Sequence, residues 1–350
     1  MSLSVDIEKK MGGFHLKVSF ETGGGVLALL GASGSGKSMT LKCIAGIERP
    51  DFGHIELDGR VLFDSDRHID LPPRKRKVAY LFQEFALFPN MTVRKNISCV
   101  VPDKSRRDTV TDDMISAMRL EGLEDRKPHE LSGGERQRTA LARILASSPE
   151  ALLLDEPFSS LDSYLRSSLE AEVADVIERL GKPAILASHD RGEAFRLSSR
   201  IALLDDGAID MEGPRNEVFE APKTVNAAKL VGFENIFPTC PESDGRLRLP
   251  SLGIGLEASF ARGDGKEGTF THVGFRTKDM KVVQDSAQGE NTFECELKRV
   301  IENPSSCTLL LKPSADAADL IAVSVGKDEA LSLKDKAMIY IPPEAVIPLA

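Results

Sequence analysis

Eight consecutive residues near the N-terminus have the composition of a phosphate-binding loop. They read GASGSGKS and fit the pattern G-x-x-x-x-G-K-[ST] in full. Glycines let the backbone curl until its N–H groups point at phosphate oxygens, and a helix that starts in the loop adds its positive dipole end. A glycine-rich turn that matches by chance is the alternative. The residues assigned to nucleotide binding are Gly31, Ala32, Ser33, Gly34, Ser35, Gly36, Lys37 and Ser38.

Two side chains of this loop have specific expected roles. Lys37 is expected to reach the β- and γ-phosphates of ATP. The hydroxyl of Ser38 is expected to bind Mg²⁺. The loop alone defines only a P-loop NTPase, so the rest of the chain must indicate which kind.

Two adjacent carboxylates follow the apolar run Ala151–Leu154. In P-loop enzymes an aspartate at the end of such a strand holds Mg²⁺, and Asp155 has this position. Glu156 beside it is placed to accept a proton from attacking water as a general base. The alternative is a solvent-facing acidic turn. Paired carboxylates at the end of a buried strand are costly without a cation, so we favour the metal and base roles.

Short apolar runs and helical spacing indicate the elements that position these residues. The runs Val26–Leu30, Ala151–Leu154, Ala184–Ala187 and Ile201–Leu204 have the length and composition of buried parallel strands. Between them, residues 165–180 carry apolar side chains spaced by three and four, which predicts a helix. Strand and helix in alternation predict an α/β fold around a largely parallel sheet.

The pattern changes after about residue 235. Helical spacing fades, and Phe293, Cys295 and Leu297 alternate with charged residues. Further short apolar runs, punctuated by Gly and Pro, complete a pattern typical of a small all-β barrel or sandwich. A length of 350 residues also suggests two domains. We predict a P-loop domain at residues 1–235 and an all-β domain at residues 236–350.

Composition excludes several classes of protein. The chain has 45 Lys and Arg against 54 Asp and Glu, and a net charge of −9 disfavours nucleic acid as a partner. Five scattered cysteines without a CxxC pair indicate reduced thiols of a cytosolic protein. No apolar run approaches the roughly 18 residues of a membrane span, and the N-terminus lacks a signal-peptide pattern. We expect a protein that reaches a membrane only through a partner.

A second anion-binding turn decides the class. Ser132, Gly133 and Gly134 precede an apolar helical strip, and by themselves they read as a capped helix start. In a P-loop protein, however, LSGGERQR at residues 131–138 resembles the signature of the ATP-binding cassette (ABC) ATPases. Three further segments resemble the Q-loop glutamine, the D-loop and the switch histidine of this family. They are YLFQE with Gln83, SSLD with Asp162, and SHD with His189.

The resemblance implies further roles for these residues. Gln83 would contact Mg²⁺ and the attacking water, and would report the γ-phosphate to a helical subdomain at about residues 86–148. His189 would contact the γ-phosphate and orient the water. Two copies would pair head to tail, with ATP between the phosphate loop of one and Ser132 and Gly134 of the other. The fold implied is a RecA-like core with that helical subdomain.

The contact with adenine is less well defined by the sequence. Family members usually stack the base on an aromatic residue some 20–25 positions before the phosphate loop, close to Met11 in this chain. Met11 is not aromatic. Phe14 lies nearby and is the candidate, and a place in the strand core is the alternative for it.

A single cassette without a membrane span resembles the separate ATPase subunit of a bacterial importer. This implies membrane permease subunits, a solute-binding protein and a place at the cytoplasmic face of the membrane. Residues 84–97 resemble the importer segment that lines the groove for a permease helix, although their apolar residues also suit a subdomain core. A soluble ABC ATPase that acts on DNA or ribosomes is the competing class, and the acidic balance disfavours it.

The solute is suggested by two further segments. Residues 62–76 most resemble molybdate importer ATPases, with the sulfate type next. Residues 273–279 resemble a stretch of TOBE/MOP β-barrel domains, which implies either an oxyanion ligand or a structural role for the C-terminal domain. An oxyanion sensor in which ATP is incidental is a third reading, and Lys37, Asp155 and Glu156 argue against it.

Overall fold

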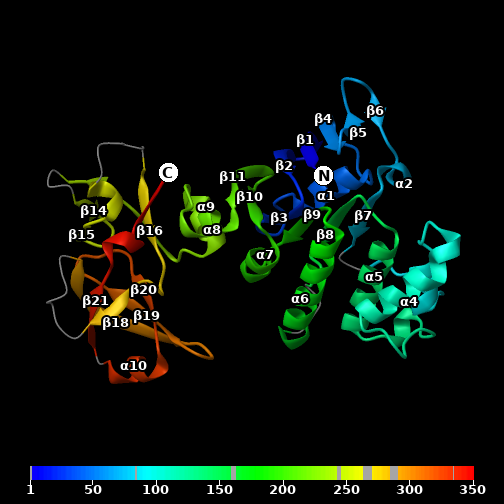
Figure 1. Cartoon of the computed structure of the whole chain (residues 1–350). Helices are drawn as coiled ribbons and strands as arrows, with labels where there is room; N and C mark the ends of the chain where they lie inside the picture. The colour runs from blue at the N-terminus through cyan, green and yellow to red at the C-terminus, as the bar shows by residue number, and fades with distance from the viewer. Residues whose placement is uncertain are drawn as a thin grey trace. The chain divides into compact units, whose positions relative to one another are not determined.

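The computed structural model describes residues 2–82, 85–158, 163–242, 246–262, 270–283, 291–333 and 335–350 (Figure 1). It divides into two compact units, Met1–Arg215 and Asn216–Ala350. The domain boundary at residue 235 stays a prediction. No helix in the described part of the chain is both long and apolar enough to cross a membrane. All five cysteines are free thiols.

The first unit contains a sheet of eleven strands. In spatial order they are β6 (Ile69–Asp70), β5 (Arg60–Asp64), β4 (Phe52–Leu57), β1 (Leu3–Met11), β2 (Phe14–Thr22), β11 (Ala208–Pro214), β10 (Arg200–Asp205), β3 (Gly25–Leu30), β9 (Pro183–Ser188), β8 (Ala151–Asp155) and β7 (Val78–Leu81). From β10 to β7 every neighbouring pair is parallel. The remaining pairs are antiparallel, apart from one parallel bridge between β11 and β2.

The four predicted strands are β3, β8, β9 and β10, and they are consecutive in the parallel part of the sheet. Every residue of β8 and β9 is buried. Strands covered on both faces need continuous apolar sequence, which is why these runs do not alternate. This confirms the α/β prediction for the first unit.

Seven α-helices are described in the first unit. They are α1 (Lys37–Ala45), α2 (Pro73–Arg76), α3 (Val93–Ser98), α4 (Arg107–Ala117), α5 (Gly133–Ala146), α6 (Ser163–Leu180) and α7 (Arg191–Leu197), with 3₁₀ turns at Lys104–Arg106 and Pro128–Glu130. Helix α1 packs on β7, β8 and β9. Helices α3, α4 and α5 pack on one another beside β7, and Figure 1 shows this helical group at the β7 edge of the sheet.

A fully buried arginine ties α1 to the chain that follows the antiparallel strands. Arg76 is 0% exposed, and its guanidinium donates to the carbonyl oxygens of Cys43 and Ile44 at the end of α1, at 2.8 and 2.9 Å. It also donates to the carbonyl oxygen of Leu71 and pairs with Asp70 at 2.9 Å. Burial lowers the pKa of Arg76, and Asp70 opposes this effect. These contacts supply buried donors to carbonyls at the end of α1, where the helix itself provides few.

The second unit is mainly antiparallel β structure. Its sheets are β12 (Asn235–Pro238), β16 (His272–Phe275) and β22 (Ile347–Leu349); β13 (Cys240–Pro241), β14 (Leu247–Leu249) and β15 (Ile254–Leu256); and β17 (Lys281–Val283), β21 (Lys336–Tyr340), β18 (Thr292–Glu302), β19 (Cys307–Lys312) and β20 (Ile321–Val325). Its short helices are α8 (Arg215–Glu220), α9 (Val225–Val231) and α10 (Lys327–Ser332), with 3₁₀ turns at Ser259–Arg262 and Pro343–Ala345.

One apolar core joins the strands of the second unit. It includes Phe237, Leu249, Phe275, Leu309 and Ile339, one from each of five strands. The described strand pairs in this unit are all antiparallel, which confirms the prediction of a small β domain. Helix α10, between β20 and β21, is an addition that alternating sequence does not predict.

Candidate functional site

The predicted phosphate loop connects β3 to the start of α1. Gly36 has a φ of 106° at the N-cap of α1, and a Cβ there would lie 2.7 Å from Leu16 Cδ1. A Cβ on Gly31 would lie 2.3 Å from the carbonyl oxygen of Leu204. Glycine is therefore required at both positions, once for the left-handed backbone and once for close approach to β10.

Lys37 folds back into the loop. Its Nζ donates to the carbonyl oxygens of Gly31 at 2.9 Å and Ala32 at 2.8 Å, and the residue is only 4% exposed. Burial lowers the pKa of Lys37, whereas the nearby charges of Glu156 and Asp155 act to raise it. The ammonium group is thus enclosed within the loop and faces the carboxylates at the end of β8.

Asp155 is held through both of its carboxylate oxygens. The Ser38 hydroxyl donates to Oδ1 at 2.8 Å, and the Tyr80 phenol donates to Oδ2 at 2.7 Å. Asp155 is 5% exposed. The burial of Tyr80 raises the pKa of its phenol, and the hydrogen bond to the charged Asp155 raises it further. Sequence reasoning missed Tyr80. The available signal was a tyrosine within an apolar strand run, because a buried phenol needs a hydrogen-bond partner.

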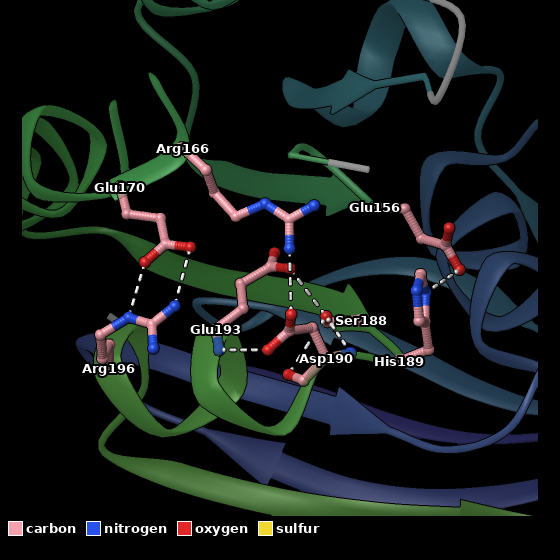
Figure 2. Close-up of polar contacts among 8 residues, drawn as sticks. All are labelled: Glu156, Arg166, Glu170, Ser188, His189, Asp190, Glu193 and Arg196. Carbon is pink, nitrogen blue, oxygen red and sulfur yellow. Dashed lines mark hydrogen bonds and ion pairs between the residues drawn. The ribbon is translucent and has the colours of Figure 1, made fainter. Parts of the chain in front are cut away.

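Glu156 and His189 meet across the ends of β8 and β9. His189 Nδ1 lies 3.2 Å from Glu156 Oε1, as Figure 2 shows. Glu156 has a φ of 47°, and its N–H donates to the carbonyl oxygen of Ala187 at 2.9 Å. The Glu156 side chain is 19% exposed and that of His189 is 58% exposed. The two predicted catalytic groups are therefore in contact and open to water.

Helices α6 and α7 support the chain just beyond His189. Asp190 caps the N-terminus of α7, and its Oδ2 pairs with Arg166 Nη1 at 3.0 Å. Arg196 pairs with both carboxylate oxygens of Glu170, at 2.7 and 3.0 Å (Figure 2). The end of β9 is therefore connected to two helices by charged side chains.

The donor groups of this region fit Mg²⁺ and a triphosphate. Ser38 and Asp155 present hydroxyl and carboxylate oxygens, which are the ligands that Mg²⁺ prefers. Ser35 Oγ is buried in the loop, with no hydrogen-bond partner among the residues that the structure describes. A polar atom of this kind is suited to a ligand that the loop would enclose.

Phe14 lies beside the phosphate loop. The β1–β2 hairpin pairs it with Met11, and it packs against the core of the first unit. A Cβ on Gly36 would come within 3.2 Å of Phe14 Cζ. The ring therefore contacts both the core and the loop region, and its role in stacking on adenine stays a prediction.

The Ser132–Gly134 turn begins α5. Ser132 Oγ accepts from the N–H of Glu135 at 3.4 Å, and Glu135 Oε2 accepts from the N–H of Ser132 at 2.7 Å. This N–H lowers the pKa of Glu135. The turn is a capping box. In the described part of the chain, Ser132 makes its polar contacts within this turn and α5. The action of Ser132, Gly133 and Gly134 on the nucleotide of a second copy stays a prediction.

Two predicted motifs lie outside the described residues. They are Gln83 with Glu84, and Ser159–Asp162. The roles of Gln83 and Asp162 therefore stay predictions. Phe85 and Ala86 directly follow Glu84 in the chain. Arg143 of α5 donates to their carbonyl oxygens, at 3.1 Å for Phe85 and 2.8 Å for Ala86. In the segment compared with importers, Phe85 is buried and Phe88 is 45% exposed, so it contributes to both core and surface.

These strands, loops and side chains define a P-loop NTPase of the ATP-binding cassette class. The ABC transporter family profile matches residues 15–159. A dimeric structure of the ATP-binding cassette MJ0796 bound to ADP and Pi is 28% identical with a TM-score of 0.53. The alignment covers 61% of this chain and 99% of the MJ0796 chain.

Comparison with curated proteins identifies the family. A sulfate/thiosulfate import ATP-binding protein of Agrobacterium fabrum is 32% identical over 336 residues, which are 93% of this chain and 92% of that protein. A molybdenum import ATP-binding protein of Paramagnetospirillum magneticum is 40% identical over 223 residues, 63% of this chain and 61% of that protein. The chain thus spans about three fifths of the molybdenum relative. A putrescine transport ATP-binding protein and a spermidine/putrescine import ATP-binding protein match as well. The chain belongs to the ABC transporter family of ATP-binding proteins.

Proposed function

We propose that this chain binds and hydrolyses ATP as the ATPase subunit of a solute importer. The observation that carries the proposal is the convergence of the phosphate loop, Asp155, Glu156 and His189 at the carboxyl ends of β3, β8 and β9. Ligands of α/β sheets bind at this edge. The names of the import ATP-binding relatives support the same function.

The chemistry follows from the groups at this edge. Loop N–H groups and Lys37 bind the β- and γ-phosphates, while Ser38 and Asp155 would hold Mg²⁺ with Gln83. When bound, Mg²⁺ neutralises charge that develops on the phosphate oxygens. Glu156 takes a proton from water as the water oxygen bonds to the γ-phosphorus and the bond to the β-phosphate oxygen breaks.

The remaining residues position these groups. Tyr80 and Ser38 fix the orientation of the Asp155 carboxylate through its two oxygens. His189 contacts Glu156, and this contact orients the base toward the water. Fixed donors and acceptors of this kind reduce the reorganisation that the reaction requires.

We further propose that two copies act together with membrane permease subunits and a solute-binding protein, at the cytoplasmic face of the membrane. Ser132, Gly133, Gly134 and Asp162 would bind the nucleotide held by the second copy. The dimeric structure of the cassette MJ0796 described above supports this arrangement. The second unit, as a TOBE/MOP-like domain, would regulate or support the dimer.

For the solute we propose molybdate. The sequence resemblance at residues 62–76 and the names of the molybdenum relatives support it. Sulfate is the second candidate, because a sulfate/thiosulfate relative aligns along 93% of this chain, including the second unit. An oxyanion is common to both proposals, which sets them apart from the polyamines of other relatives.

Hydrolysis is tested with Glu156→Gln in the full-length protein. We expect ATP turnover to fall by about 10²-fold or more, since the base is lost, while ATP binding stays intact. Glu178→Gln on the exposed face of α6 is the matched control and should keep the wild-type rate. A Glu156→Gln protein that hydrolyses ATP as fast as the wild type would exclude Glu156 as the base.

The solute is tested by uptake in the host cell. Cells that carry Lys37→Ala in place of the wild-type chain should lose uptake of labelled molybdate and retain uptake of sulfate and putrescine. Loss of sulfate uptake instead would identify sulfate as the solute and would leave the importer proposal in place. Unchanged uptake of all three would contradict import of these solutes. Calorimetric titration of the full-length chain with molybdate, tungstate and sulfate tests for an oxyanion site.

A further inference from the structure

A buried carboxyl group lies next to the candidate site without a role in the chemistry above. Glu193, in the first turn of α7, is 4% exposed. Its Oε2 accepts a hydrogen bond from Ser188 Oγ at 2.9 Å. Its Oε1 is buried and has no hydrogen-bond partner within the described residues. A buried carboxyl with one open oxygen costs stability, so its presence needs a reason.

The contacts of Glu193 enclose the backbone of His189. The hydroxyl of Ser188 donates to Glu193 and accepts from the N–H of Asp190 at 2.9 Å. The N–H of Glu193 in turn donates to Asp190 Oδ1 at 2.9 Å. These three hydrogen bonds form a closed ring through Ser188, Asp190 and Glu193, and His189 is the residue between the first two (Figure 2).

The ring is attached to rigid elements. Asp190 Oδ2 pairs with Arg166 on α6, and the Arg196–Glu170 pair joins α7 to α6 a turn further on. Glu170 is 3% exposed, so this second pair is anchored in the interior. The ring that contains Glu193 is therefore joined to α6 and α7 at the end of β9.

We propose that Glu193 is a positioning residue that fixes the backbone of His189 and, through it, the contact of His189 Nδ1 with Glu156. The inference rests on the proposed function, in which Glu156 and His189 act on ATP. Without the Glu193 acceptor, the Ser188 hydroxyl keeps only the long contact to the carbonyl oxygen of Asp190, at 3.5 Å, among the described residues. Its orientation toward the N–H of Asp190 is then no longer fixed. The imidazole would then lose its fixed distance from Glu156.

The surroundings of Glu193 offset the effect of burial on its pKa only in part. Burial raises its pKa to about 7; the Ser188 hydrogen bond lowers it, the charges of Asp190 and Glu170 raise it, and Arg166 lowers it. The carboxyl is thus retained at an energetic cost. A side chain of equal volume without oxygen would fill the same space at no such cost, which argues that the acceptor itself is used.

The experiment compares two nearly isosteric variants of the full-length protein. Glu193→Gln keeps an oxygen acceptor for Ser188, and Glu193→Leu keeps volume but removes it. Ser188→Ala removes the donor. For Glu193→Leu and Ser188→Ala we expect kcat for ATP to fall about tenfold or more with KM nearly unchanged, since the base is misplaced but the nucleotide still binds. Glu193→Gln should keep a kcat near that of the wild type.

Amide exchange gives a readout that does not need activity. In Glu193→Leu, the N–H of Asp190 should exchange with solvent faster, while β8 amides keep their protection. Glu178→Leu, on the exposed face of α6, is the control and should change neither exchange nor kcat. Unchanged exchange at Asp190, or a wild-type kcat in Glu193→Leu, would overturn the inference. Equal losses of kcat in the Gln and Leu variants would also overturn it.

The outcomes separate this inference from the proposed function. A wild-type chain that does not hydrolyse ATP would refute the proposed function, and the exchange measurement would then decide on Glu193 alone. A wild-type chain that hydrolyses ATP, with a fully active Glu193→Leu variant, would refute only the role of Glu193.

Discussion

The buried Glu193 carboxyl should make the stability of the first unit depend on pH. Burial raises its pKa from the ordinary value of 4.5 to about 7. Between these values the folded chain holds a proton that the unfolded chain releases. Stability therefore falls as the pH rises from 4.5 to 7, and this group adds no further change above that. The difference between the two pKa values corresponds to roughly 3 kcal/mol.

Glu193→Gln removes this ionisation and keeps nearly the same shape. The unfolding free energy of the wild type should fall by roughly 2–3 kcal/mol from pH 5 to pH 8 through this group, and that of the variant should not. The difference appears at pH 8, where the wild-type chain must either ionise the buried carboxyl or bind a proton from dilute solution. At pH 5 most of this cost is absent, so the two proteins should differ mainly through the amide itself.

The assay is urea unfolding of the full-length chain at both pH values, followed by pulsed amide exchange. Peptides from β8 and β9 report on the first unit, and peptides from β19 report on the second unit as an internal control. Glu178→Gln, an exposed site on α6, is the matched variant and should follow the wild type. If Glu193→Gln and the wild type respond equally to pH, the carboxyl is not buried as described, and the reasoning fails.

Two further predictions concern buried polar side chains, one in each unit. Arg76→Met should destabilise the first unit by about 1–3 kcal/mol, because carbonyls at the end of α1 lose the guanidinium as a buried donor. The exposed Lys77→Met should have little effect on β8 and β9 exchange. A cost below 1 kcal/mol would contradict this account. Asn291→Ala should cost about 1–3 kcal/mol at β19 and nothing at β8, because the 2% exposed amide bonds the backbone of Glu257 and Ile341. Protection lost in both units together would show that they do not unfold independently.

The features that sequence predicted correctly are local in the chain. The runs that became β3, β8, β9 and β10 are apolar throughout, because each is covered on both faces. The glycines of the phosphate loop follow from backbone geometry at single positions. Such signals need no knowledge of a distant partner.

The features that sequence reasoning missed depend on pairs far apart in the chain. Tyr80 and Asp155 are 75 positions apart, and only the adjacency of β7 and β8 brings them together. The ring around His189 depends on how α7 returns to the end of β9. The strands β1, β2, β4–β6 and β11 extend the five parallel strands to a sheet of eleven, a size that the apolar runs did not indicate. The site was therefore predictable as a set of motifs, and its supporting contacts were not.

The position of β3 in the sheet has a consequence for synthesis of the chain. Its neighbours on both sides are β9 and β10, which follow it by some 150 residues or more. During translation the apolar β3 therefore leaves the ribosome long before either neighbour and remains an unpaired edge in the meantime. Such edges pair readily with other chains. The strand that carries the phosphate loop is thus the part of the nascent chain that most needs shielding until residue 205 has emerged.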